Sequence, residues 1–217
     1  MSVLLRNLLI VDVQEDFVEG GALAVAGGRG VAAAISAFLS EHAERYTTII
    51  ASRDWHNPGE TNGGHFAARS ATSGSGFGFK GDEVPNYDTT WPEHCVAGTP
   101  GAAYAPELNQ DYITYRIKKG QGRPAYSMFE GTTDSGVALT DLTMSTGCGR
   151  FDIVGIATDY CVLRTALDAA RFGFSARVIV DLTAGVATAS TAAALTEMHY
   201  RGIDLTTSKR AFPKGRR

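Results

Sequence analysis

The chain has 217 residues, of which 44% are hydrophobic and 20% charged, a composition that excludes a largely disordered protein and suffices for a sizeable core. Its net charge is −3, and lysine and arginine are concentrated only in a short basic tail at 209–217, which we interpret as a solvated end. We therefore expect no nucleic-acid or anionic-membrane partner. The sequence has no apolar run of the roughly 18 residues that span a membrane and no secretion signal, so we expect a cytoplasmic protein.

Segments typical of strands alternate with segments typical of helices along the chain. Short apolar runs predict strands at 8–13, 48–52, 112–117, 151–156, 176–181 and 203–206. Apolar residues at helical spacing predict helices at 31–45, 136–146, 159–172 and 190–200. This order predicts a single α/β domain over 1–217, with helices on both faces of a mainly parallel sheet.

One long segment, 53–110, interrupts this alternation. It has little periodicity, a glycine-rich stretch at 73–81, and three histidines, at 56, 65 and 94. A long irregular segment inside a compact domain is usually functional or disordered, and the histidines favour a function. We interpret the segment as a lid that also supplies metal ligands.

Cys161 follows the fourth predicted strand and falls in the first turn of a predicted helix that Thr158 or Asp159 can cap. In that turn the unpaired N–H groups and the helix dipole favour a thiolate, the nucleophilic form of cysteine. The alternative is a packing role, which we assign to Cys95 and Cys148 because free cysteines are among the most buried residues. Three cysteines at irregular spacing do not make a disulfide framework.

Four reactive side chains lie at or just after the ends of the first four predicted strands. Asp12, Asp54, Lys119 and Cys161 should meet at the carboxyl edge of the sheet, where open α/β sheets bind ligands. Asp12 lies in an apolar strand and needs a partner, which Lys119 can supply. Burial would raise the pKa of Asp12 towards that of a general base, and Lys119 would oppose the rise. A purely structural Asp12–Lys119 ion pair is the alternative.

A second cluster combines one carboxylate with three imidazoles, from Asp54, His56, His65 and His94. This donor set suits one divalent metal ion, with zinc preferred and iron or manganese as alternatives. Loop histidines held only by hydrogen bonds are the competing interpretation. Aromatic residues near both clusters could form the walls of a pocket for a flat ring, or could serve only as packing anchors; they are Phe17, Trp91 and Tyr126.

Seven motifs, in this order, resemble the nicotinamidases of the isochorismatase-like cysteine hydrolase superfamily. They are LLIVDVQEDFVEGGALAVAGG, SRDWH, GGHF, WPEHCVAGTPGA, KKGQ, AYSMFEG and GIATDYCVLRTALDA. The resemblance runs from about residue 8 to residue 205. It implies a three-layer α/β/α sandwich and hydrolysis of nicotinamide, with pyrazinamide as a candidate second substrate, in NAD salvage. The sequence leaves open whether the protein is a monomer or a homo-oligomer.

The resemblance also assigns roles to single residues. It implies a catalytic triad of Cys161, Asp12 and Lys119, and a metal held by Asp54, His56, His65 and His94. A cis peptide at Ile156–Ala157 would place the N–H groups of Ala157 and Cys161 as an oxyanion hole. The substrate ring would lie between Phe17 and Trp91, near Tyr126 and Ile156, with its nitrogen on the metal.

The chain departs from the family pattern at Tyr160, where several relatives have histidine, and at 67–90, which is longer than in compact members. Both changes affect the expected pocket wall or lid, and therefore the range of substrates. Three alternatives stay open: hydrolysis of another small amide, water activation by the metal with Cys161 in a packing role, and a non-catalytic ligand-binding or redox-sensing protein.

Overall fold

The computed structural model describes residues 5–67 and 84–212. The glycine-rich stretch at 73–81, most of the segment predicted to be long at 67–90, and the last five residues of the basic tail lie outside this part. Within the described ranges, no helix is both long and apolar enough to cross a lipid bilayer.

A six-stranded sheet, parallel throughout, forms the middle layer, in the order β3-β2-β1-β4-β5-β6. Its strands are β1 (Asn7–Val11), β2 (Thr48–Asp54), β3 (Tyr115–Lys119), β4 (Arg150–Ile156), β5 (Ser175–Ala184) and β6 (Asp204–Thr206). β1, β2 and β4 are buried along nearly their whole length because helices cover both faces of the sheet. The predicted α/β/α sandwich is confirmed, and all six predicted strands are found with shifted ends.

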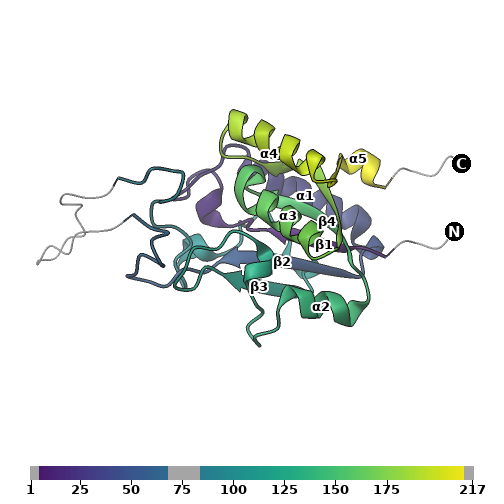
Figure 1. Cartoon of the computed structure of the whole chain (residues 1–217), viewed down its shortest axis with the longest axis horizontal. Helices are drawn as coiled ribbons and strands as arrows, with labels where there is room; N and C mark the ends of the chain where they lie inside the picture. Colours follow the sequence, from purple (N-terminus) through teal and green to yellow (C-terminus); the bar gives the residue numbers. More distant parts are fainter. Residues whose placement is uncertain (1–4, 68–83, 213–217) are drawn as a thin grey trace, which may run out of the picture.

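Helices cover the two faces unequally. They are α1 (Gly28–His42), α2 (Leu139–Thr146), α3 (Leu163–Arg171), α4 (Thr188–Tyr200) and α5 (Ser208–Ala211). Apolar residues of α1, such as Ile35 and Leu39, pack with Leu8 and Ile10 on one face. Residues of α2, α3 and α4 pack with Leu9 and other residues on the opposite face. Figure 1 shows α3 and α4 side by side on that face.

Two features of the close strand packing bear on the site. Gly155 in β4 has a φ of 117°, and a Cβ there would lie 2.1 Å from the carbonyl oxygen of Val11, so only glycine allows β4 to approach β1 at this point. The next peptide, Ile156–Ala157, is cis, as the family resemblance implied.

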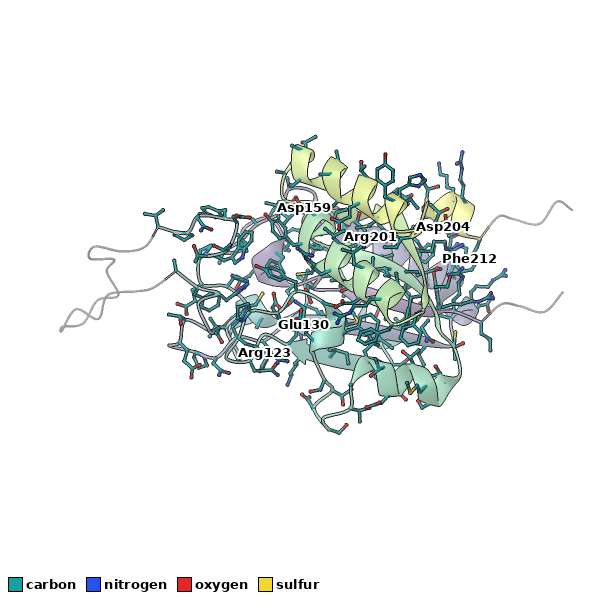
Figure 2. The ribbon with its side chains drawn as sticks, in the orientation of Figure 1. Arg123, Glu130, Asp159, Arg201, Asp204 and Phe212 are labelled. Carbon is teal, nitrogen blue, oxygen red and sulfur yellow. The ribbon has the colours of Figure 1, made fainter. Side chains whose placement is uncertain are left out.

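The basic tail does not begin as the solvated end that we predicted. Ser208–Ala211 forms α5, which starts where Asp181 accepts hydrogen bonds from the N–H and hydroxyl of Ser208. Ala211 is buried, and the ring of Phe212 stacks on Phe38 of α1 at 6.1 Å. Ala211 and the following Phe212 therefore anchor this segment to the core that residues of α1 and β5 share. Phe212 lies away from the end of the molecule that carries the long loops (Figure 2).

Candidate active site

The carboxyl edge of the sheet brings the four predicted strand-end residues together. Asp54 and Lys119 are the last residues of β2 and β3 and are paired in register across the two strands. Asp12 directly follows β1 with a φ of 46°, a backbone region that residues other than glycine rarely adopt and that is typical of functional sites. Cys161 lies in the turn after β4, and its sulfur and the carboxylates of Asp12 and Asp54 lie within 4.8 Å of one another.

Lys119 lies at the centre of this cluster and is fully buried. Its Nζ is 2.9 Å from Oδ2 of Asp12 and 2.5 Å from Oδ1 of Asp54. It also donates to the carbonyl oxygen of Ala125 at 3.2 Å and lies 3.7 Å from the sulfur of Cys161. One ammonium group thus contacts both carboxylates and the thiol.

The charges of the cluster push its pKa values apart. Burial raises the pKa of Asp12, and Lys119 opposes that rise, as the sequence predicted. Burial acts in the same direction on Asp54, but there Lys119 and His56 outweigh it and the pKa is lowered. Burial alone would lower the pKa of Lys119, yet the two carboxylates raise it well above its ordinary value. Asp54 therefore stays a carboxylate and Lys119 an ammonium, while Asp12 is the group suited to exchange a proton.

Two polar side chains that the sequence analysis missed hold the carboxylate of Asp12 and the backbone of Asp54 in place. The hydroxyl of Ser52 donates to Oδ1 of Asp12 at 2.6 Å. The amide of Gln14 accepts from the N–H of Asp54 at 2.8 Å and donates to its carbonyl at 2.9 Å. Both residues are fully buried, and a buried polar residue beside an apolar strand is the signal that could have identified them.

The geometry of the turn that carries Cys161 and the pKa of the Cys161 thiol both differ from the prediction. Cys161 lies in a π-helical turn, Thr158–Val162, that precedes α3, and neither Thr158 nor Asp159 caps it. The carboxylate of Asp159 instead accepts the N–H groups of Val186 and Ala187 at the start of α4. Burial raises the pKa of Cys161 well above its usual range, although Lys119 opposes the rise, so the thiolate that we expected from the helix start is not favoured. A base must remove the proton.

The second predicted cluster also assembles. The imidazole nitrogens of His56, His65 and His94 lie within 4.8 Å of one another, and all three residues are buried. Oδ2 of Asp54 lies 3.8 Å from Nε2 of His56 and 3.9 Å from Nε2 of His94. Asp54 thus faces Lys119 with one oxygen and the histidines with the other.

The donor atoms of this second cluster fit a metal ion. Among the described residues, Nε2 of His56 and both ring nitrogens of His65 are buried without a hydrogen-bond partner, an arrangement that buried polar groups rarely tolerate. Nδ1 of His56 and of His94 contact the carbonyls of Gly120 and Pro92 at 2.9 and 2.7 Å, which orients Nε2 of each ring towards the centre. Burial lowers the pKa of His65 to about 3, so its ring is neutral and able to act as a ligand at neutral pH.

Gly120 makes room for this arrangement. Its φ is 86°, and a Cβ at this position would lie 2.6 Å from the ring of His56. Because Gly120 has no side chain, the chain can turn directly beneath the ring of His56. The carbonyl of Gly120 then contacts Nδ1 of the same ring.

A cavity of about 390 Å³, its open mouth included, lies above the two clusters. Of the predicted residues, it is lined by Phe17, Asp54, His65, Trp91, His94, Tyr126, Ala157 and Cys161. Ile156 does not line this cavity; its side chain is fully buried in the core. Tyr160, which the sequence analysis expected to affect the pocket wall, also lines the cavity, and three further lining residues were not predicted, namely Leu23, Val25 and Val186. Val186 follows β5, so extending the strand-end argument to the fifth strand would have found it.

Comparison with known proteins places the chain in a family. The chain belongs to the isochorismatase family, whose domain matches residues 6–210. It is 44% identical over 205 residues to the nicotinamidase/pyrazinamidase of Mycobacterium tuberculosis, covering 94% of this chain and 100% of that protein.

Solved structures agree with this assignment. The structure of L. infantum PnC1 in complex with nicotinate has a TM-score of 0.75 and 30% identity, covering 96% of each chain. The structure of the pyrazinamidase of Pyrococcus horikoshii in complex with zinc has a TM-score of 0.73 and 32% identity, covering 93% of this chain and 98% of that one. The resemblance inferred from the sequence motifs is confirmed.

Proposed function

We propose that the protein is a nicotinamidase, which hydrolyses nicotinamide to nicotinate and ammonia and also accepts pyrazinamide. The observation that carries this proposal is Lys119, whose ammonium contacts both carboxylates and the thiol beneath an aromatic-lined cavity. The similarity to enzymes that are named nicotinamidase or pyrazinamidase supports the choice of substrate. The reaction belongs to NAD salvage, and residues 1–217 act as one catalytic domain.

The proposed chemistry proceeds through a thioester on Cys161. Asp12 takes the proton of the thiol, and the sulfur attacks the carboxamide carbon to form a C–S bond. Asp12 returns the proton to the nitrogen as the C–N bond breaks and ammonia leaves. Asp12 then takes a proton from water, whose oxygen attacks the thioester carbon, and the released sulfur recovers its proton. Lys119 stays protonated throughout and stabilises the anionic states of Asp12 and Cys161.

Backbone N–H groups of Ala157 and Cys161 are the proposed donors to the oxyanion of each tetrahedral intermediate. The N–H groups of Tyr160 and Val162, on either side of Cys161, both bond to the carbonyl of Ala157, and that of Cys161 is not part of this pair. We propose that the N–H of Cys161 faces the cavity that its own side chain lines.

Asp54, His56, His65 and His94 would hold one divalent metal ion, for which we propose zinc before iron or manganese. A metal bound there would supply a Lewis-acidic position for the ring nitrogen of the substrate. The residues of the chain then complete the placement of the ring, with Phe17 and Trp91 on its faces and Tyr126 beside it, all three of which line the cavity. No partner beyond the small-molecule substrate is required.

The direct test measures ammonia release from nicotinamide by the purified protein and by Cys161→Ala. We expect the substitution to lower kcat by on the order of 10³-fold or more, because it removes the acyl carrier. Cys148→Ala is the matched control, since Cys148 is also buried but lies outside the cavity. Near wild-type turnover by Cys161→Ala would favour water activation by the metal. Turnover of other small amides but not of nicotinamide would place the enzyme elsewhere in its family.

A further inference from the structure

Tyr160 forms part of the cavity wall directly beside Cys161, and the mechanism above does not use it. Its ring meets that of Trp91 edge-on, with centroids 4.9 Å apart and planes at 89°. It lies nearly parallel to the ring of Tyr126 at 6.2 Å, and Nε1 of Trp91 donates to the hydroxyl of Tyr126 at 2.9 Å. The three aromatic side chains therefore form one connected wall, and Tyr160 is the member that comes from the turn of Cys161.

The hydroxyl of Tyr160 makes a second connection, a long hydrogen bond of 3.3 Å to the carbonyl oxygen of Tyr87. Tyr87 has a φ of 57° and lies in a turn at 86–90. Oδ1 of Asn86 holds this turn by accepting three successive N–H groups, those of Asp88, Thr89 and Thr90. The contact thus joins the turn of Cys161 to a compact, internally bonded turn of the long segment.

Trp91, just after that turn, is tied to the histidine cluster. Its N–H donates to the carbonyl of His65 at 2.9 Å, and its own carbonyl accepts from Ala67 at 3.0 Å. The ring of Tyr87 also meets that of Trp91 edge-on at 6.2 Å. The packing and the hydrogen bond of Tyr160 therefore set the distance between the turn of Cys161 and the wall that includes Trp91 and His65.

We propose that Tyr160 is a specificity-determining residue that closes the outer side of the cavity and limits the substrate to an amide on a single six-membered aromatic ring. This inference rests on the proposed amide hydrolysis. On this proposal, the second ring of a fused bicyclic amide would need the space that the ring of Tyr160 fills in the cavity wall, and the hydroxyl of Tyr160 holds the 86–90 turn beside it. Tyr160 does not contact the reacting atoms, so its removal changes which amides enter more than how fast a bound nicotinamide reacts.

The first arm of the test compares kcat/KM for nicotinamide with that for quinoline-3-carboxamide. In Tyr160→Ala we expect the bicyclic-to-monocyclic ratio to rise about tenfold or more, the scale on which a pocket discriminates by size. In Tyr160→Phe, which keeps the ring and removes the hydrogen bond, the rise should be about fivefold or less. Tyr200→Ala, on the exposed face of α4, is the control and should leave the ratio unchanged.

The second arm does not depend on turnover. The alkylation rate of Cys161 is measured by peptide mass spectrometry with iodoacetamide and with a bulky N-aryl maleimide. Tyr160→Ala should increase the maleimide rate about tenfold relative to the iodoacetamide rate, because only the larger reagent needs the space of the phenol. If wild type releases no ammonia, the proposed function fails, and this arm alone decides whether Tyr160 limits access by size. An unchanged maleimide-to-iodoacetamide ratio overturns the inference, as does an unchanged amide ratio in an active enzyme.

Discussion

A buried cluster of charged side chains lies at each end of strand β4, and the two clusters differ in how many of their buried polar atoms have a hydrogen-bond partner. Near the amino end, Asp152 accepts four hydrogen bonds, from Nη1 of Arg6, Nε and Nη2 of Arg177, and the hydroxyl of Tyr46. Beyond the carboxyl end, the cluster around Lys119 adjoins imidazole nitrogens that have no partner among the described residues. The first arrangement is a closed structural network, and the second has coordination left for a ligand.

The difference teaches which buried charge to associate with function. Asp152 and Asp12 are both fully buried, so burial alone does not distinguish them. Two guanidinium groups hold Asp152, whereas Asp12 shares one ammonium with Asp54 and lies beside a thiol. The functional site is distinguished by one cation shared between two carboxylates and by nearby imidazole nitrogens that have no hydrogen-bond partner among the described residues.

The largest effect is expected for Lys119→Met, which removes the ammonium group that Asp12 and Asp54 share. This change leaves two carboxylates buried without a counter-charge, so it should lower kcat/KM by on the order of 10³-fold. It should also lower the free energy of unfolding by about 3–5 kcal/mol, measured in urea. Lys118→Met is the matched control, because Lys118 is the preceding residue of β3 and pairs with the exposed Asp134. A fully active Lys119→Met enzyme would contradict the proposed role.

Breaking the closed network should separate stability from activity. Asp152→Ala leaves Arg6, Arg177 and Tyr46 without their shared acceptor, and should lower the free energy of unfolding by about 3–5 kcal/mol. Activity per folded molecule should not change, since the site lies at the other end of β4. Urea unfolding and nicotinamide kinetics below the melting temperature measure the two effects. Asp168→Ala, which removes a 3.9 Å surface pair with Arg171, is the control. A parallel loss of kcat would show that the two ends are coupled.

Metal addition should stabilise the protein through the histidine cluster and not through the Asp152 network. After chelation and dialysis, zinc at 100 times its Kd should raise the free energy of unfolding by about 2.7 kcal/mol, followed as an increase in melting temperature. Asp152→Ala should keep this increase. His65→Ala should lose most of it, because neither ring nitrogen of His65 has a hydrogen-bond partner among the described residues. An equal zinc response in His65→Ala and wild type would place the metal elsewhere.

Much of this contrast was predictable from sequence, for a physical reason. Parallel strands end at one edge, so locating the strands was enough to bring Asp12, Asp54, Lys119 and Cys161 together. The presence of His56, His65 and His94 in one long segment that begins beside Asp54 likewise suggested the second cluster. These predictions needed only the order of the elements and tolerated errors of several residues in strand ends, such as the start of β3 at Tyr115 instead of residue 112.

Contacts between segments far apart in sequence were not predictable in this way. Thr158 or Asp159 was expected to cap the helix that follows Cys161, but Asp159 instead accepts hydrogen bonds from the start of α4, which depends on how α3 and α4 pack. The pKa of Cys161 was expected to fall, because a helix start was considered without the burial that opposes it. The Tyr160–Tyr87 contact and the packing of α5 arise only when the whole chain is folded.

The smallest expected effect is that of Glu19→Gln, which tests a carboxylate that has hydrogen-bond donors but is not buried. The exposed Glu19 accepts the N–H groups of Gly27 at 2.6 Å and Arg29 at 2.9 Å, and so holds the first turn of α1. The N–H of Arg29, with that of Gly27, lowers the pKa of Glu19 below its ordinary value. Glu19→Gln should therefore lower the melting temperature at pH 7, but by less than Asp152→Ala, because an exposed carboxylate loses little hydration on folding.

The sign of the pH dependence follows from the lowered pKa of Glu19. The extra stability is present above the pKa of the unfolded chain and is lost as the pH falls through the lower pKa of the folded state. The difference in melting temperature between wild type and Glu19→Gln should thus persist above about pH 5 and shrink below about pH 4. Glu44→Gln, at an exposed position in the 3-10 turn after α1, is the control and should show no such pH-dependent difference. A difference that grows on acidification would mean that repulsion between charges, and not the capping of α1, governs the effect of Glu19.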